Sequence, residues 1–221
     1  MKINISKHVE EFSNKTHSVN YMRHGAFKSE LYIIFCLYKE LGCNFFIESG
    51  LCNGVSTNTL LTLISDDYIG IDMDEACQAA KIEKPNFRFM HDKTEDRIFE
   101  LIRPDKQIFV FIDGPKGQMA IELKNQLLGH DNVKVVAIHD TYDGIEHDTH
   151  MRVFETQSNE EYNKKYFEIL NQKNESKVAT IYNTDIYDTV DGQVVYRNYN
   201  EWYPTGPGLS VYSKAPLEIV I

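Results

Sequence analysis

Five short apolar runs recur through the first two thirds of the chain, and each of the first four is followed by a turn and then a segment with helical spacing. The runs are mostly continuous rather than alternating, which is typical of strands buried on both faces of a parallel sheet. Strands that alternate with helices predict βαβ units with helices on both sides of the sheet. The predicted strands are residues 44–48, 68–73, 87–90, 108–113 and 133–139, and the predicted helices between them are residues 56–64, 75–82, 95–102 and 116–128.

The flanking segments extend this pattern at both ends. A helix over residues 24–41, ended by Gly42, precedes the first strand, because a glycine readily adopts the left-handed conformation that ends a helix. After the fifth strand we predict a helix over residues 153–171 and two antiparallel edge strands over residues 178–182 and 209–213.

The fold prediction is therefore a single α/β domain spanning residues 1–221. It is Rossmann-like, with a doubly wound, mostly parallel sheet, an antiparallel C-terminal edge and helices on both faces. Residues 1–42 are expected to form a helical segment beside the substrate, and residues 43–221 the Rossmann-like core.

Composition excludes several classes of partner. The chain has 23 Lys and Arg against 33 Asp and Glu, a formal net charge of −10, which argues against nucleic acid because phosphate binding depends on basic side chains. No apolar run approaches the ~18 residues of a membrane span, and the N-terminus lacks the apolar core of a signal peptide. The four cysteines form no CxxC pair, so we expect reduced thiols and a cytoplasmic protein.

The first predicted strand ends in the sequence ESGLCNGVST, which contains Glu48, Gly50, Gly54 and Ser56. The two glycines allow a sharp turn and a close approach to a ligand, and the next helix begins with unpaired amides. The spacing is neither GxGxxG nor the lysine-containing phosphate loop. It resembles the first motif of class I S-adenosylmethionine-dependent methyltransferases, which implies that these four residues contact that cofactor.

Acidic residues end the next two predicted strands. Asp72 lies at a strand tip after the glycine turn, where a carboxylate can bind both hydroxyls of a ribose, and the resemblance gives it that role. Asp92 matches a family position near the adenine amino group, although it could equally cap the next helix. Asp74 fits better as the N-cap of the helix over residues 75–82 than as a ligand contact.

Asp113 and Asp140 end the fourth and fifth predicted strands. Two carboxylates brought together repel each other unless a cation lies between them, and Mg²⁺ is the natural occupant. This arrangement resembles the metal-dependent branch related to catechol and caffeoyl-CoA O-methyltransferases, in which a lysine follows the first aspartate by three residues and an Asp-Asn pair ends the fifth strand. Asp113, Lys116 and Asp140 match that pattern, and Thr141 stands in place of asparagine. The implied metal ligands are Asp113, Asp140 and Thr141.

Two chemistries remain open from the sequence. With a metal, the cation acidifies a bound substrate hydroxyl and Lys116 accepts the proton. Without a metal, His139 serves as general base, while Asp113 contacts the methionine part of the cofactor or orients the substrate. In both, the main catalytic contribution is alignment of the two reactants.

The resemblance implies an enzyme that methylates a hydroxyl of a small molecule (a sugar, a phenol or a natural product) with S-adenosylmethionine. The alternative is a methyltransferase-like binding protein without turnover. An aromatic loop over residues 191–207 either stacks on the substrate, packs as a lid or is buried between two copies in a homodimer. Its aromatic residues are Tyr196, Tyr199, Trp202 and Tyr203.

Overall fold

The structure, a computed structural model, describes residues 2–16, 19, 26, 28–141, 177–181, 187–190, 193–196, 208–214 and 217–220. The strands of the central sheet are β2 (Phe45–Ser49), β3 (Asp67–Asp72), β4 (Phe87–His91), β5 (Ile108–Ile112), β6 (Val133–Thr141), β7 (Lys177–Ile181) and β10 (Gly208–Ser213). The α-helices are α1 (Val9–Thr16), α2 (Lys28–Glu40), α3 (Val55–Leu63), α4 (Thr94–Arg97) and α5 (Gly117–Leu127). Short 3-10 helices are η1 (Ile5–His8), η2 (Gln78–Lys81) and η3 (Ile98–Leu101).

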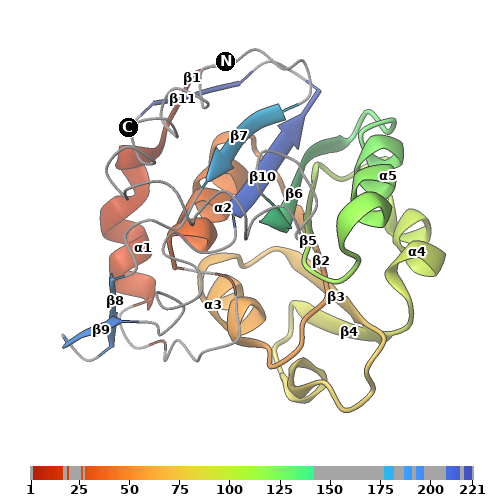
Figure 1. Ribbon diagram of the computed structural model, residues 1–221, viewed down its shortest axis with the longest axis horizontal. Helices are drawn as coiled ribbons and strands as arrows, with labels where there is room; N and C mark the ends of the chain where they lie inside the picture. The colour runs from red at the N-terminus through yellow and green to blue at the C-terminus, as the bar shows by residue number, and fades with distance from the viewer. Residues whose placement is uncertain are drawn as a thin grey trace, which may run out of the picture.

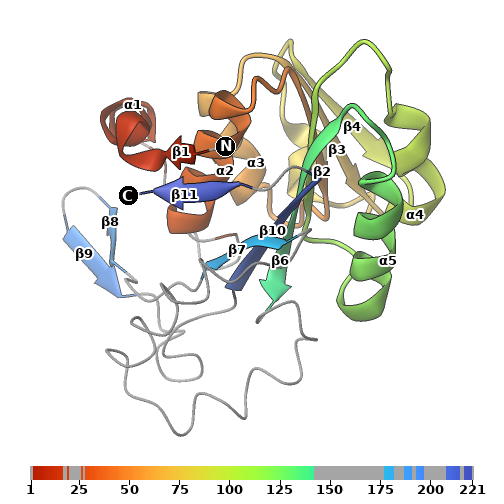
Figure 2. The same cartoon turned by 90° about the horizontal axis from the view of Figure 1, so that it is seen from above.

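The central sheet has seven strands within the described part of the chain, in the order β4-β3-β2-β5-β6-β10-β7. The first five are parallel, and β10 pairs antiparallel with both β6 and β7. Helices α2 and α3 lie on one side of the sheet and α4 and α5 on the other (Figures 1 and 2). The predicted doubly wound fold with an antiparallel C-terminal edge is confirmed.

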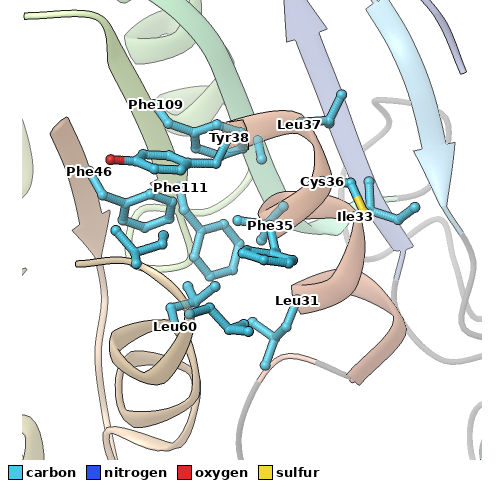
Figure 3. Packing of buried hydrophobic residues seen from close by; sticks show 14 of the residues in the cluster. Leu31, Ile33, Phe35, Cys36, Leu37, Tyr38, Phe46, Leu60, Phe109 and Phe111 are labelled. Carbon is cyan, nitrogen blue, oxygen red and sulfur yellow. The ribbon is translucent and has the colours of Figure 1, made fainter. Parts of the chain in front are cut away.

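The two faces of the sheet have separate hydrophobic cores, which explains why its strands are apolar without alternation. On the α2 side the core is aromatic: Phe46 and Phe109 stack with their ring centroids 5.2 Å apart, and Phe111 lies beside them (Figure 3). On the other side aliphatic residues of the same strands pack against α5. These include Ile47, Val110, Ile112, Val136 and Ile138.

Helix α2 is shorter than predicted but ends where expected. Ala26 is not helical, and the helix begins at Lys28. After Glu40 the chain turns at Gly42, whose φ is +62°. The amide of Cys43 donates to the carbonyl of Tyr38 at 3.0 Å, which is the bond of a left-handed helix cap.

Two helix predictions are wrong in detail. Of residues 75–82 only Gln78–Lys81 are helical, and they form a 3-10 helix. The Cys77 thiol and the Gln78 amide both donate to the carbonyl of Cys52, at 2.8 Å and 3.2 Å. This contact with the turn after β2 replaces the local bonds of an α-helix. Residues 95–102 divide into α4 and η3 rather than forming one α-helix.

Several elements were not predicted. Strand β1 (Lys2–Asn4) pairs in parallel with β11 (Glu218–Val220), so the two ends of the chain lie together (Figure 2). Strands β8 (Tyr187–Val190) and β9 (Gln193–Tyr196) form a hairpin, which includes part of the predicted aromatic loop. The predicted helix over residues 153–171, and Tyr199, Trp202 and Tyr203, lie outside the described residues.

No helix in the described ranges is long and apolar enough to span a membrane.

Candidate functional site

The carboxyl ends of β2, β3 and β5 meet where the strand order reverses. The chain proceeds from β2 to β3 on one side of β2, whereas β5 lies on its other side. The Gly50 amide donates to the carbonyl of Ile71 at 2.8 Å, and the amides of Asp113 and Gly114 both donate to the carbonyl of Ser49 at 2.7 and 2.8 Å. Ligands of doubly wound sheets bind at such a reversal.

Gly50 and Gly114 bring two backbones into contact at this point. Gly50 has a φ of +79°, and a Cβ there would lie 2.2 Å from the Gly114 nitrogen. Gly54 has a φ of +72° and forms the N-cap of α3, where a Cβ would lie 3.2 Å from Cα of Ala79. Both glycines of the motif are therefore required for the geometry of the turn. We call residues 49–56 the glycine turn.

Asp72 holds the glycine turn in place. Its Oδ2 accepts hydrogen bonds from the amides of Leu51 at 2.7 Å and Cys52 at 3.0 Å, and its Oδ1 accepts one from the Asp74 amide at 2.9 Å. Cys52 has a φ of +45°, so this carboxylate also stabilises a strained residue. A carboxylate accepts about four hydrogen bonds, so the three donors among the described residues leave one acceptor position for a ligand. The predicted ribose contact stays a prediction.

Glu48 is fully buried beneath the glycine turn. Its Oε2 accepts hydrogen bonds from the hydroxyls of Thr57 and Tyr68, each at 2.7 Å. Its Oε1 has no hydrogen-bond partner among the described residues. The pKa of Glu48 is raised to about 8, chiefly by burial and in smaller part by the negative charges of Asp113 and Asp72, while the two hydroxyl bonds lower it. The group is therefore held mainly as a neutral carboxylic acid near pH 7.

Asp113 and Lys116, which were predicted to act together, form an ion pair. Lys116 Nζ lies 2.5 Å from Asp113 Oδ1, and both side chains are partly exposed. Lys116 is the N-cap residue of α5. The lysine thus balances the charge of the carboxylate that ends β5.

His139 contacts a residue that the sequence analysis missed. Its Nδ1 lies 3.2 Å from Oε1 of Glu30, and both side chains are buried. Glu30 belongs to the first turn of α2, and the His139 ring lies edge-on to Phe111. The one sequence signal was an acidic residue at the start of an otherwise apolar helix, which is not specific enough to identify a partner 109 residues away.

Asp92 follows β4 at the expected edge, but it neither caps a helix nor stands alone. Its Oδ2 accepts a hydrogen bond from Arg97 Nε at 2.7 Å, and its Oδ1 accepts one from the Lys93 amide at 2.9 Å. The N-cap of α4 is Lys93, without a side-chain cap. The Arg97 guanidinium lowers the pKa of Asp92. The predicted cap is therefore wrong, and the predicted adenine contact stays a prediction.

Ser56 and Asp74 make local contacts. The hydroxyl of Ser56, at the start of α3, is buried and accepts a hydrogen bond from the Ala26 amide at 2.9 Å. Ala26, two residues before α2, therefore contacts the glycine turn. Asp74 Oδ1 accepts a hydrogen bond from the Ala76 amide at 2.9 Å, which closes a turn rather than capping the predicted helix.

The predicted metal ligands are described only in part. Asp140 and Thr141 are the last residues of β6, and their side chains lie outside those described. Among the side chains that are described, no three His, Cys, Asp or Glu residues gather in a way that could hold a metal ion. The metal site stays a prediction.

Known structures resemble this chain in fold. No protein-family model matches it, and no curated protein does. The O-methyltransferase TomG from Streptomyces achromogenes, in complex with SAM, matches with a TM-score of 0.54 at 13% identity over 93% of this chain and 88% of that one. A cofactor-bound protein from MTB matches with a TM-score of 0.55 at 10% identity over 95% and 90%. An O-methyltransferase from Bacillus cereus in complex with SAH matches with a TM-score of 0.50 at 13% identity over 95% and 90%. The chain thus shares its Rossmann-like fold with these solved structures.

The contact between Gly50 and Gly114 predicts a large loss of stability on Gly50→Ala. The methyl group meets backbone that cannot move aside, so we expect a cost of about 2 kcal/mol beyond that of the positive φ. Gly42→Ala is the matched control, because Gly42 has a positive φ with nothing within 4 Å of its Cβ position, and should cost about 1 kcal/mol. Urea unfolding measures both, and equal losses would contradict the close contact.

The buried acid predicts an unusual pH dependence of stability. The pKa of Glu48 is about 8 in the folded protein and near 4.5 in the unfolded chain, so between these values the folded state binds the extra proton. The unfolding free energy should therefore fall as pH rises through this window, by at most about 1.4 kcal/mol per pH unit from this group.

Glu48→Gln removes that titration while keeping a similar shape. Relative to the unmodified protein, the variant should gain stability steadily from pH 5 to pH 8, as measured by urea unfolding at four or more pH values. If the difference in unfolding free energy between the two proteins does not vary with pH, the pKa of Glu48 is the same in the folded and the unfolded protein, which would contradict this prediction.

Proposed function

We propose that this protein is an S-adenosylmethionine-dependent methyltransferase that transfers a methyl group to a hydroxyl of a small molecule. One observation carries the proposal. Carboxyl groups of Glu48, Asp72 and Asp113 surround a glycine turn at the reversal point of the sheet, and residues 49–56 include no lysine or arginine. Solved structures with this fold hold SAM or SAH, which also supports the proposal.

The charge of this edge favours a cationic ligand over a phosphate. Dinucleotides bind a similar turn through their pyrophosphate, which the carboxylate of Asp72 beside the turn would repel. S-adenosylmethionine carries a sulfonium and an ammonium group, both positive. The unpartnered Oε1 of Glu48 and the carboxylate of Asp72 therefore suit its charge.

Five of the predicted cofactor residues have a proposed task on the turn and at the strand ends beside it. Gly50 and Gly54 let the turn lie close to the cofactor, and the amides at the start of α3 face its carboxylate together with Ser56. Asp72 would use its remaining acceptor position for the ribose. Asp92 would face the adenine from the end of β4.

The cofactor supplies an electrophilic methyl group on its sulfonium, and the protein has to align the acceptor oxygen and remove a proton. Lys116 and His139 are the proposed proton acceptors. Lys116 is paired with Asp113, and a lysine ammonium accepts a proton only after losing its own. His139 is held by the carboxylate of Glu30, an arrangement in which an acidic residue orients an imidazole base.

A divalent cation is implied by the resemblance to the metal-dependent branch. Of its predicted ligands, Asp113 is paired with Lys116, and the side chains of Asp140 and Thr141 lie outside the described set. The side chains that are described do not by themselves compose a cation site. No step of the proposed reaction is therefore routed through a metal.

Cofactor binding gives the first test. We expect S-adenosylmethionine to bind in isothermal titration calorimetry, and Asp72→Asn to weaken binding by at least about tenfold, because the amide nitrogen cannot accept the bonds that hold the glycine turn. Asp74→Asn is the control: the Asp74 side chain is exposed and accepts one local hydrogen bond among the described residues, so the variant's affinity for the cofactor should stay within about twofold of that of the unmodified protein. No binding at millimolar cofactor would overturn the proposed function.

Turnover gives the second test, with labelled methyl transfer from S-adenosylmethionine to a panel of catechols, phenols and sugars. If Asp113, Asp140 and Thr141 hold Mg²⁺, excess EDTA should abolish transfer and added Mg²⁺ should restore it, because the cation acidifies the acceptor hydroxyl. Undiminished transfer in EDTA would contradict the metal prediction and leave His139 and Lys116 as proton acceptors. Binding without transfer to any acceptor would instead favour a binding protein.

A further inference from the structure

Glu48 is a buried acid that its surroundings leave incompletely satisfied. It occupies the fourth position of β2, two residues before Gly50. Among the buried side-chain oxygen and nitrogen atoms of the described residues, Oε1 of Glu48 is the one that has no hydrogen-bond partner. A buried polar atom without a partner is costly, and such atoms in native proteins often mark functional sites.

The groups that surround Glu48 come from three elements. From α3 and β3, the hydroxyls of Thr57 and Tyr68 donate to Oε2, so both bonds go to the same oxygen. From the ends of β3 and β5, Asp72 and Asp113 act on it with negative charge. Of these two, Asp113 has its charge balanced by Lys116, whereas the Asp72 carboxylate accepts its hydrogen bonds from backbone amides within the described residues.

This environment stabilises the neutral form of Glu48 until a positive charge arrives. Burial and the two negative neighbours act in the same direction, and the two hydroxyl bonds oppose them only in part. The proposed cofactor has one net positive charge and would lie on the glycine turn, directly above this residue. A cation there reverses the balance, because it favours the ionised carboxylate.

We propose that Glu48 gives up a proton when S-adenosylmethionine binds, so that cofactor binding by this protein is linked to pH. The inference rests on the proposed function. It adds that the protonation state of one buried residue, Glu48, changes in response to the positive charge of the cofactor. The bond that breaks is the carboxyl O–H bond, and the proton passes to solvent.

The expected size of the linkage follows from electrostatics. A unit positive charge about 6 Å away, at an effective dielectric constant of about 20, lowers a carboxyl pKa by about two units. A pKa of about 8 would then fall to about 6 in the complex. At pH 7 binding would release about 0.8 proton, and affinity would rise about 25-fold between pH 6 and pH 8.

Calorimetry in two buffers tests the proposal directly. S-adenosylmethionine is titrated into the protein at pH 7 in phosphate and in Tris, whose ionisation enthalpies differ, so the difference in heat gives the number of protons released. We expect about 0.8 proton for the unmodified protein and a value near zero for Glu48→Gln. Glu83→Gln, at an exposed position, should behave as the unmodified protein does.

A second variant covers the case in which Glu48→Gln does not fold. Tyr68→Phe removes a hydrogen bond that lowers the pKa of Glu48, so the rise in affinity should move to higher pH. Infrared difference spectra should show a protonated carboxyl band that S-adenosylmethionine removes, and Tyr68→Phe should shift the frequency of that band because it deletes a hydrogen bond to the carboxyl group.

The outcomes separate the two proposals. Cofactor binding with equal proton release in the unmodified protein and Glu48→Gln would overturn the linkage while leaving the proposed function standing. An affinity profile that Tyr68→Phe does not shift would also contradict the linkage. Failure of S-adenosylmethionine to bind at any pH would overturn the proposed function itself.

Discussion

The contact between the backbones of Gly50 and Gly114 determines how the candidate site is built. Because neither residue has a side chain, the ends of β2 and β5 approach closely enough for the Ser49 carbonyl to accept hydrogen bonds from two successive amides, those of Asp113 and Gly114. The same turn is bonded to β3 through the Gly50 amide and through the Asp72 carboxylate. The ends of β2, β3 and β5 are thus connected by hydrogen bonds in which at least one partner is a backbone group. These bonds fix where Asp72 and Asp113 lie.

The sheet could be predicted from the sequence because parallel strands that are buried on both faces consist of continuous apolar runs. All five predicted parallel strands are present within one or two residues at either end, and the Gly42 helix end was also correct. The failures involve long-range contacts. Residues 75–82 have a helical composition, but Cys77 and Gln78 bond to Cys52 of the glycine turn instead. The pairing of β1 with β11 joins the two ends of the chain, and short sequence windows contain no sign of such a partner.

The candidate site was predictable in position but not in its internal bonds. Strand topology alone brings the residues after β2, β3, β4 and β5 to one edge, and motif spacing identified Glu48, Asp72 and Lys116 as members. Sequence could not show that the Asp72 carboxylate is largely engaged by backbone amides, since that depends on the path of the turn. Nor could it show that Glu30 of α2 faces His139, because the contact needs the whole sheet and its covering helix to be in place.

At position 48, the residue type that would best stabilise the fold differs from the residue type that the proposed function needs. A leucine or methionine there would avoid the cost of a buried, half-satisfied acid, and nearly every other position facing the α2 side of the sheet is apolar or aromatic. Positions that break the pattern of their surroundings are expected where function requires it. A neutral acid costs the fold less than an ionised one and still responds to a nearby cation. The exception at Glu48 therefore makes physical sense for a turn that receives a positively charged cofactor, and it would make little sense for one that receives a phosphate.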